Sequence, residues 1–506
     1  MIDILGHLGH GFVHVLAPAN VAALLVGLVV GMLVAILPGL TLVMGVVLVL
    51  PFTYGMALLP SIIMLTAMYI SGTYGGAFTS ILFRIPGEPL DVPLLWDGYT
   101  MGRKGAPAKA LGWTLYAALW GGLLTSTCMV LLAQPFAKFA LSFDAPEYFS
   151  VIMFGLTSVV ALAGTSMSNA LISLFIGLLL STVGVDEIYG AQRFTFGIPV
   201  LADGIKYITI MVGAYGLGEV FTRLEQGFQT QPVQYSAKRI KTQLPTLREV
   251  WGLRGTFVRS SLIGVLLGIV PGAGATITSF VSYGAESQYG KRSARLGTGI
   301  PEGIVAPQIA STASVGGHMV PLLTLGIPGS GATAIILGAF LLHGVQPGPQ
   351  LFTDPKSTAL VYAIFASLFL SVVGMCAMGY FWIRSLIKVM DAPEAVVSAF
   401  VVLFCVIGAY SERNDLNDVW MLVIFGIVGY LFDRFRFPVA PLVLGAILGP
   451  EAETAFMTSM ISHKNDWVGA FFGRPISCTL MILTFVALGF PLIRAALRAR
   501  RAWRAR

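Results

Sequence analysis

Two apolar stretches of this sequence are each cut in the middle by proline and glycine, and these cuts constrain the fold more than any other feature. The first stretch, residues 31–41, contains Pro38-Gly39, and the second, residues 261–283, contains Pro271-Gly272-Ala273-Gly274. Proline lacks a backbone donor and glycine adopts non-helical angles, so a helix is expected to break at each position. In hydrocarbon, a broken backbone is tolerated only where protein or a water-filled cavity satisfies the freed groups. Breaks of this kind are typical of binding sites at mid-membrane.

The composition around these breaks indicates a membrane protein. Of the 506 residues, 56% are hydrophobic and 11% are charged, whereas a globular domain has about 25% charged residues. Long apolar runs recur between residues 21 and 497. At about 20 residues per crossing, we expect an all-α polytopic membrane protein with roughly 10–12 membrane segments. This pattern argues against a soluble enzyme.

The net charge of +7 comes from 31 basic and 24 acidic residues. The basic residues lie in loops and in the C-terminal tail, where the positive-inside bias places them, so they do not indicate a nucleic-acid partner. The arginine-rich tail, residues 498–506, is therefore predicted to be cytoplasmic and close to anionic lipid.

The sequence contains an internal repeat, whose motifs recur in the same order with an offset that drifts from 233 to 247 residues. One match would be chance, whereas several in order indicate a duplicated unit. The matching motifs are Ile36-Leu37-Pro38-Gly39 with Ile269-Val270-Pro271-Gly272, Gly75-Gly76 and Ile85-Pro86-Gly87 with Gly316-Gly317 and Ile327-Pro328-Gly329, Leu95-Trp96-Asp97-Gly98 with Leu341-Leu342-His343-Gly344, and Asp144-Ala145-Pro146-Glu147 with Asp391-Ala392-Pro393-Glu394.

This repeat predicts a division of the chain into five parts. They are an N-terminal interfacial segment (1–20), a first membrane repeat (21–221), a basic cytoplasmic linker (222–258), a second membrane repeat (259–497) and a basic cytoplasmic tail (498–506). The number of crossings within residues 437–475 stays open at this point.

The basic residues also predict opposite orientations for the two repeats. In the second repeat they lie on both sides of the break, at 238–259 and 291–295, so a single crossing would place one cluster outside. A hairpin that enters and leaves on the cytoplasmic side avoids this, and arms of about ten to twelve residues reach the middle of the bilayer. In the first repeat the loop after the break, residues 51–60, has no charge. This reversal is typical of inverted-topology repeats, each with a re-entrant helical hairpin.

A second interruption is expected in the segment that follows each hairpin. Residues 61–85 contain Ser71-Gly72-Thr73-Tyr74-Gly75-Gly76, and residues 304–327 contain Ser311-Thr312-Ala313-Ser314-Val315-Gly316-Gly317. These runs of hydroxyl-bearing residues and glycines predict a broken helix in each repeat.

The breaks supply groups that can bind a solute. Helix ends offer N–H groups to an anion, and unwound carbonyls and hydroxyls offer oxygen ligands to a small cation. A serine or threonine in a membrane helix also commonly bonds its own backbone, so no single hydroxyl identifies the site. The candidate substrate- and ion-binding residues are Pro38, Gly39, Thr41, Ser71, Thr73, Gly75, Gly76, Pro271, Gly272, Gly274, Thr276, Thr278, Ser311, Thr312, Ser314, Gly316, Gly317 and His318.

Two titratable residues near these breaks have alternative roles. His318 is a candidate for relaying a proton or binding a carboxylate, and the alternative is a buried, hydrogen-bonded core histidine. Its counterpart in the first repeat is Ala77. Arg84 is a candidate partner for an anionic substrate, although an interfacial anchor paired with Glu88 fits its expected depth better.

No sequence motif indicates catalysis or a cofactor. There is no phosphate-binding P-loop and no HExxH zinc motif. Cys128, Cys376, Cys405 and Cys478 have no paired spacing and are interpreted as core residues rather than disulfide or metal sites. Three histidines, at positions 7, 10 and 14, lie on one helical face, which fits an interfacial helix better than a metal site.

At these motifs the sequence resembles the large membrane subunit of the tripartite tricarboxylate transporters (TctA-like). The most specific parts are residues 74–89, residues 268–275 and the run 321–349, which ends in Leu341-Leu342-His343-Gly344-Val345-Gln346-Pro347-Gly348-Pro349. Members usually show an acidic residue and an Asn-Asn pair where this chain has Gln308 and Ser311-Thr312, and a serine in place of Ala77. The resemblance implies a bacterial inner-membrane transporter with a small four-helix membrane subunit, a periplasmic solute-binding protein and an inward cation gradient, often of sodium.

The prediction for function is a cation-coupled importer of small organic anions (carboxylates), with sodium or alternatively protons as the coupling ion and no further cofactor or metal. The alternatives are a channel, a stand-alone ion-coupled transporter without a binding protein, and a membrane-embedded hydrolase. A channel is expected to line a continuous path with polar residues, whereas here they gather at two breaks. A hydrolase needs a titratable pair at mid-depth, and His318 has no evident partner in the sequence.

Overall fold

The structure, a computed structural model, describes residues 2–37, 40–84, 86–162, 167–186, 188–227, 242–272, 274–381 and 394–504. Nearly all of them are helical, and one short hairpin pairs β1 with β2 in antiparallel register, Gly184 opposite Arg193. Among the described residues, six helices are long and apolar enough to cross a membrane. The prediction of an all-α polytopic membrane protein is therefore confirmed.

The chain divides into two compact units, which are described separately. Unit 1 comprises Met1–Ala140 and Gly227–Phe404. Its elements are α1 (Ile2–Val15), α2 (Pro18–Ile36), α3 (Leu42–Val49), η1 (Leu50–Gly55), α4 (Leu58–Phe83), η2 (Pro89–Asp91), α5 (Leu94–Arg103), α6 (Pro107–Ala140), α12 (Leu247–Gly252), α13 (Arg254–Ile269), α14 (Gly274–Tyr289), η5 (Ser293–Arg295), α15 (Glu302–Leu325), α16 (Gly331–Leu342), η6 (Pro349–Phe352), α17 (Pro355–Phe381) and the start of α19 (Glu394–Arg413).

Unit 2 comprises Leu141–Gln226 and Cys405–Arg506. Its elements are α7 (Ala145–Leu162), α8 (Met167–Ser181), β1 (Gly184–Val185), β2 (Gln192–Arg193), α9 (Pro199–Ala202), α10 (Tyr207–Met211), η3 (Val212–Leu217), α11 (Gly218–Gln226), the rest of α19, α20 (Leu416–Arg434), α21 (Val439–Ser462), α22 (Trp467–Phe472) and α23 (Pro475–Arg504). The region in which the crossing count was open contains α21, which is one of the six membrane-length helices.

The compact units do not coincide with the two sequence repeats, because each repeat contributes its first part to unit 1 and its second part to unit 2. Within unit 1 the repeat is visible as a matched order of elements. The elements α2, α3, α4, α5 and α6 recur as α13, α14, α15, α16 and α17. The packing is reciprocal: α4 contacts α2, α16 and α17, and α15 contacts α13, α5 and α6. Two copies related by a twofold axis pack in this way. Their inverted orientation in the membrane stays a prediction.

Both proline-glycine stretches interrupt the helix, as predicted. Helix α2 ends at Ile36 and α3 begins at Leu42, while α13 ends at Ile269 and α14 begins at Gly274. Pro38, Gly39 and Ala273 lie outside the described residues. In the second break Gly272 has φ 84° and Gly274 has φ 60°, values at which a side chain would strain the backbone.

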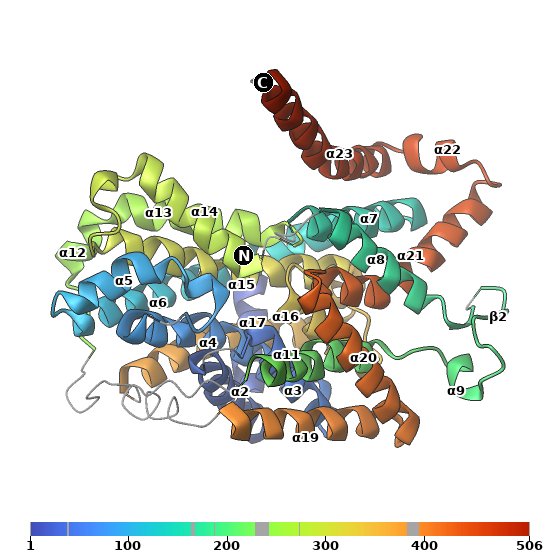
Figure 1. Cartoon of the computed structure of the whole chain (residues 1–506), viewed down its shortest axis with the longest axis horizontal. Coiled ribbons are helices and arrows are strands. Elements are labelled where there is room, and N and C mark those ends of the chain that lie inside the picture. The colour runs from blue at the N-terminus through green and yellow to red at the C-terminus, as the bar shows by residue number, and fades with distance from the viewer. Residues whose placement is uncertain are drawn as a thin grey trace. The chain divides into compact units, whose positions relative to one another are not determined.

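The arms of the second break form a helical hairpin, and α13 and α14 lie side by side (Figure 1). The guanidinium of Arg259 pairs with the Glu286 carboxylate, and the Thr256 hydroxyl donates to Glu286 Oε1 over 3.2 Å. Both bonds join the ends of the arms that are far from the break, so the arms run antiparallel. In the first break, α3 packs on α2 close to the tip, where Gly45 faces Val34.

The predicted second interruptions are wrong, because α4 and α15 run unbroken through Ser71–Gly76 and Ser311–Gly317. The hydroxyls return their hydrogen bonds to their own helix: Ser71 to the Met68 carbonyl at 3.2 Å and Ser314 to the Ser311 carbonyl at 2.7 Å. The glycines permit close packing, since a Cβ on Gly75 would lie 2.8 Å from the Met32 carbonyl oxygen. A glycine inside a helix costs about 1 kcal/mol, which tight packing offsets.

Helices α4 and α15 end at Phe83 and Leu325, three residues before Pro86-Gly87 and Pro328-Gly329. The C-cap residues Arg84 (φ 61°) and Gly326 (φ 71°) both have left-handed backbone angles. The chain leaves each helix there and enters the turn that leads to α5 or α16.

The end of the predicted linker is attached to the start of α6. The Gln243 N–H donates to the Ala108 carbonyl over 2.9 Å, and the Lys109 ammonium pairs with Glu249 at 2.5 Å. The hydrogen bond from Lys109 lowers the pKa of Glu249 to about 2. Residues 228–241 of the linker lie outside the described residues.

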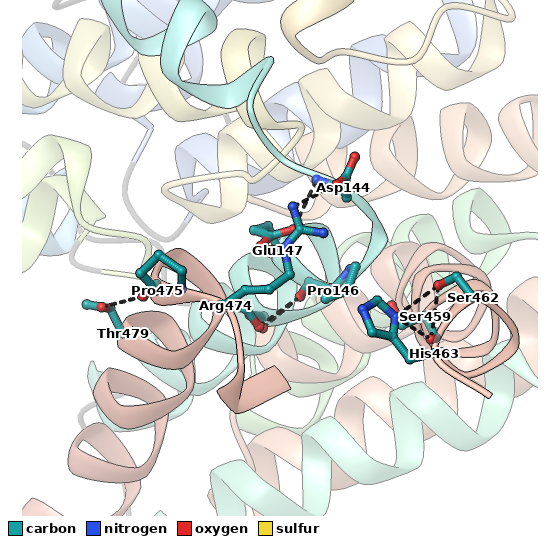
Figure 2. A network of polar contacts seen from close by, with 11 residues as sticks. Asp144, Pro146, Glu147, Ser459, Ser462, His463, Arg474, Pro475 and Thr479 are labelled. Atoms are coloured by element: carbon teal, nitrogen blue, oxygen red, sulfur yellow. Dashed lines mark hydrogen bonds and ion pairs between the residues drawn. The ribbon is translucent and has the colours of Figure 1, made fainter. Parts of the chain in front are cut away.

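In unit 2, the repeat motif at Asp144 is part of an ion-pair network between α7 and α23 (Figure 2). The Arg474 guanidinium contacts Asp144 Oδ2 and the buried Glu147 Oε1, both at 2.7 Å. The hydroxyls of Ser150 and Ser477 lie 2.7 Å apart beside it. The matching motif of the second repeat falls on Asp391-Ala392-Pro393, outside the described residues.

Candidate functional site

In each repeat, the tip of the hairpin is bonded to the turn that follows the long helix. The Gly272 N–H, at the second tip, donates to the Gly329 carbonyl over 3.0 Å. The Leu42 N–H, at the first tip, donates to the carboxylate of Glu88. The same two parts therefore meet in both repeats, a hairpin tip and a Pro-Gly turn.

Both turns continue into a capping box, in which the first residue and the residue three positions later exchange hydrogen bonds. In the first repeat the pair is Glu88 and Asp91, and in the second it is Ser330 and Thr333. Glycine lets each turn approach its long helix. A Cβ on Gly87 would lie 2.4 Å from Gly76 Cα, and one on Gly329 would lie 2.6 Å from His318 Cδ2.

The repeats also bond to one another at the two turns. The Tyr69 hydroxyl, from α4, lies 2.7 Å from His318 Nδ1 and 3.0 Å from Ser330 Oγ. The Ser279 hydroxyl, from α14, donates to the Leu90 carbonyl in η2 over 2.7 Å. Tyr69 and His318 are buried, with 2% and 0% of their surface exposed. Each turn is therefore bonded to a helix of the other repeat in the interior of unit 1.

A second polar contact joins α4 and α15 further along their length. The Gln308 amide donates to the Thr73 carbonyl and to Thr312 Oγ1, both at 3.0 Å, and Thr73 Oγ1 lies 3.4 Å from Thr312 Oγ1. Two buried polar atoms here have no hydrogen-bond partner among the described residues, Gln308 Oε1 and His318 Nε2. Both atoms therefore keep unused hydrogen-bonding capacity.

The structure brings together only part of the predicted site. Thr73, Thr312, Gly272 and His318 contact the opposing repeat or a turn, as described above. The others act locally. Thr41 caps α3 by accepting from the Met44 N–H at 3.2 Å, Thr278 bonds the Gly274 carbonyl at 2.7 Å, and Ser311 bonds the Gln308 carbonyl at 3.1 Å. Pro271 is buried and Thr276 is partly exposed.

The glycines that were predicted to bind solute through their backbone instead allow close packing with neighbouring residues. Gly76 faces Asp91, Gly316 faces Thr125 and Gly317 faces Gly268, each with less than 3 Å for an added Cβ.

The interpretation of Arg84 as a partner of Glu88 is wrong. The Arg84 guanidinium lies 5.6 Å from the ring centroid of Tyr99, a cation–π contact, and Arg84 is exposed. Glu88 is 6% exposed and binds the tip of the first hairpin. The left-handed C-cap at Arg84 ends α4, and Glu88 lies beyond it in the capping box of η2.

Asp97 is a positioning residue that sequence reasoning missed. Its carboxylate, fully buried in α5, accepts four hydrogen bonds of 2.8–2.9 Å. The donors are the Tyr283 hydroxyl and the N–H groups of Gly297, Gly299 and Ile300. It thereby fixes the loop between the second hairpin and α15. The available signal is its place in the repeat motif Leu95-Trp96-Asp97-Gly98.

The two hairpin tips favour ligands of opposite charge. Helices α14 and α16 begin within two residues of the bond between Gly272 and Gly329, so two positive helix ends lie near His318. At the first tip, the start of α3 is already occupied by the Glu88 carboxylate. The second tip is therefore suited to an anion and the first to a cation.

Comparison with known proteins agrees with this architecture. Residues 21–444 match the tripartite tricarboxylate transporter TctA family. An uncharacterised 52.8 kDa protein of the TAR-I ttuC′ 3′ region of Agrobacterium vitis is 34% identical over 501 residues, covering 99% of this chain and 98% of the relative. A second protein, from the TAR-II ttuC′ 3′ region, is 35% identical over 238 residues, 47% of this chain and 97% of the relative. No solved structure gives a significant match. The chain belongs to the TctA family, the large membrane subunits of tripartite tricarboxylate transporters.

Proposed function

We propose that this chain is the translocation subunit of a binding-protein-dependent secondary transporter that imports small organic anions, of the carboxylate class, with a cation gradient. The observation that supports it most directly is the buried contact between the repeats, in which Tyr69 of α4 bonds His318 of α15 and Ser330 of the second turn. A helix start beside an unpartnered, buried histidine nitrogen favours a carboxylate. Movement of one hairpin against the other would alternate access to this region.

Membership of a tripartite family supports the partners in this proposal. They are a periplasmic solute-binding protein that delivers the anion, a small four-helix membrane subunit, and the bacterial inner membrane, with the C-terminus of this chain in the cytoplasm. The chain itself carries out no catalysis and needs no cofactor beyond the transported coupling ion.

The proposal predicts that His318→Ala lowers carboxylate uptake by about tenfold or more. Loss of a hydrogen bond to a charged group costs about 1.5–3 kcal/mol, and 1.4 kcal/mol is a factor of ten. Uptake of radiolabelled succinate, malate and citrate is measured in cells expressing the chain with its partner subunits. The control is His463→Ala, since the side chain of His463 in unit 2 bonds only Ser459 and Ser462 in the described structure. The proposal would be contradicted if none of these anions were taken up, or if their uptake did not depend on any cation gradient.

The inverted orientation of the repeats makes a separate prediction. After replacement of the four native cysteines, a cysteine at Tyr54 is expected to react with an impermeant maleimide from the periplasmic side. A cysteine at Ser287, which is exposed at the end of α14, is expected to react only from the cytoplasmic side. The positive-inside bias is the physical reason. Labelling of both positions from the same side would exclude inverted repeats.

A further inference from the structure

The two hairpin tips share an architecture but differ in charge, and this difference points to the coupling ion. Glu88 and Asp91 take the places in the first turn that Ser330 and Thr333 take in the second. The first tip therefore carries two carboxyl groups where its structural counterpart carries two hydroxyls.

The two carboxyl groups are enclosed by the protein. Glu88 is 6% exposed and Asp91 is 0% exposed. The Glu88 carboxylate accepts from the Leu42 N–H, and the Glu88 N–H donates to Asp91 Oδ2 over 3.1 Å. Asp91 is pressed onto α4, because a Cβ on Gly76 would lie 2.0 Å from its Oδ2. The other oxygen, Asp91 Oδ1, is buried without any hydrogen-bond partner among the described residues.

No described basic residue balances this pair. Helices α4, α14 and α15 pack on η2, and their titratable groups are engaged elsewhere or are uncharged. Tyr69 bonds His318, Tyr283 bonds Asp97, Glu286 pairs with Arg259, and Glu302 pairs with Arg292. The remaining groups on these helices are Tyr74, Tyr289 and the C-cap Arg84, which contacts Tyr99.

Two buried, unpaired carboxylates are energetically untenable, since an isolated buried charge takes a counter-charge or is neutralised. The start of α3 offsets about half a charge. About one and a half negative charges then remain, so at least one further positive charge is needed. A metal cation requires several oxygen ligands, whereas Asp91 offers one unpartnered oxygen. A proton needs only one oxygen and no cavity.

We propose that Asp91 Oδ1 binds the coupling proton, with Glu88 linking its occupancy to the first hairpin. In the step, the Asp91 carboxylate and a proton from the outer side form a carboxylic acid, which later releases the same proton to the cytoplasm. Loss of the proton leaves two repelling charges, which weakens the tie between Glu88 and Leu42 that fixes the tip. This inference rests on the proposed import function.

The test has one arm that requires no substrate. Infrared spectra of the purified chain in lipid nanodiscs are recorded during a pH titration. A protonated carboxyl band is expected in the wild type, and it should be lost in Asp91→Asn. It should remain in Asp186→Asn, the matched control, since Asp186 in unit 2 is a buried carboxylate that caps backbone N–H groups and faces Arg193. A band unaffected by Asp91→Asn, or no such band, would overturn the inference.

The second arm measures transport in vesicles that contain the complete transporter, with labelled succinate, malate and citrate. An inward proton gradient is expected to drive accumulation in the wild type, and Asp91→Asn should lose accumulation while retaining exchange. Glu88→Gln, whose amide oxygen can still accept from Leu42, should also lose proton-driven accumulation. This second variant tests the proposal if Asp91→Asn does not fold. Accumulation driven by sodium alone would overturn the proton site and leave the import function intact. Accumulation under neither gradient would contradict the import function. The infrared spectra would still show whether Asp91 binds a proton.

Discussion

Replacement of Pro271-Gly272 by Ala-Leu is expected to abolish uptake while the chain still inserts into the membrane. Removal of proline restores a helix-compatible residue, a change of about 3 kcal/mol in favour of helix. Leucine disfavours the φ of 84° that Gly272 adopts, by about 1–2 kcal/mol. Helices α13 and α14 should therefore tend to merge, and the bond from Gly272 to the Gly329 carbonyl should be lost.

The measurements are carboxylate uptake and the amount of chain in the membrane fraction. Gly284→Leu is the matched control, because a Cβ there meets no atom within 4 Å and the position lies on the same hairpin. It should transport at nearly the wild-type rate. Normal uptake by the Ala-Leu variant would show that the helix break is not needed for function.

Asp97→Ala is expected to destabilise unit 1 by about 3 kcal/mol, since hydrogen bonds to a charged group contribute about 1.5–3 kcal/mol each and water can replace some of them. Four donors lose their acceptor, three of them in the loop before α15. Because that loop positions α15, which carries His318 and Gln308, uptake should fall together with stability.

Thermal unfolding of the purified chain in lipid checks this expectation. Asp354→Ala is the control, since Asp354 is exposed and its carboxylate bonds only Ser357 and the Lys356 backbone in the described structure. An equal midpoint for the two variants would mean that Asp97 contributes no more than a surface cap.

The sequence was most informative where the outcome depends on the local chemistry of the backbone. Membrane class follows from composition, and the helix breaks follow from Pro38-Gly39 and Pro271-Gly272, because proline and glycine act on their own residues. The family follows from motifs that are contiguous in the chain. The matched order of helices within unit 1 was likewise evident from the spacing of the repeated motifs.

Local composition was misleading where packing outweighs propensity. Ser71–Gly76 resembles a break as much as residues 36–41 do, yet α4 continues through it. The difference is that Gly72, Gly75 and Gly76 contact Leu42, Met32 and Asp91, which are distant in sequence. A propensity cost of about 1 kcal/mol per glycine is small beside such packing.

The chain's own sequence thus determined that it is an interrupted-helix membrane protein of a transporter family, because those properties reside in composition and in contiguous motifs. Only the tertiary structure decided which polar groups meet: Glu88 with Leu42, Asp97 with Gly299, and Tyr69 with His318. The two residues of these pairs are 46, 202 and 249 positions apart in the sequence, in that order. Contacts at that range depend on how helices pack, and no local pattern of residue types specifies them.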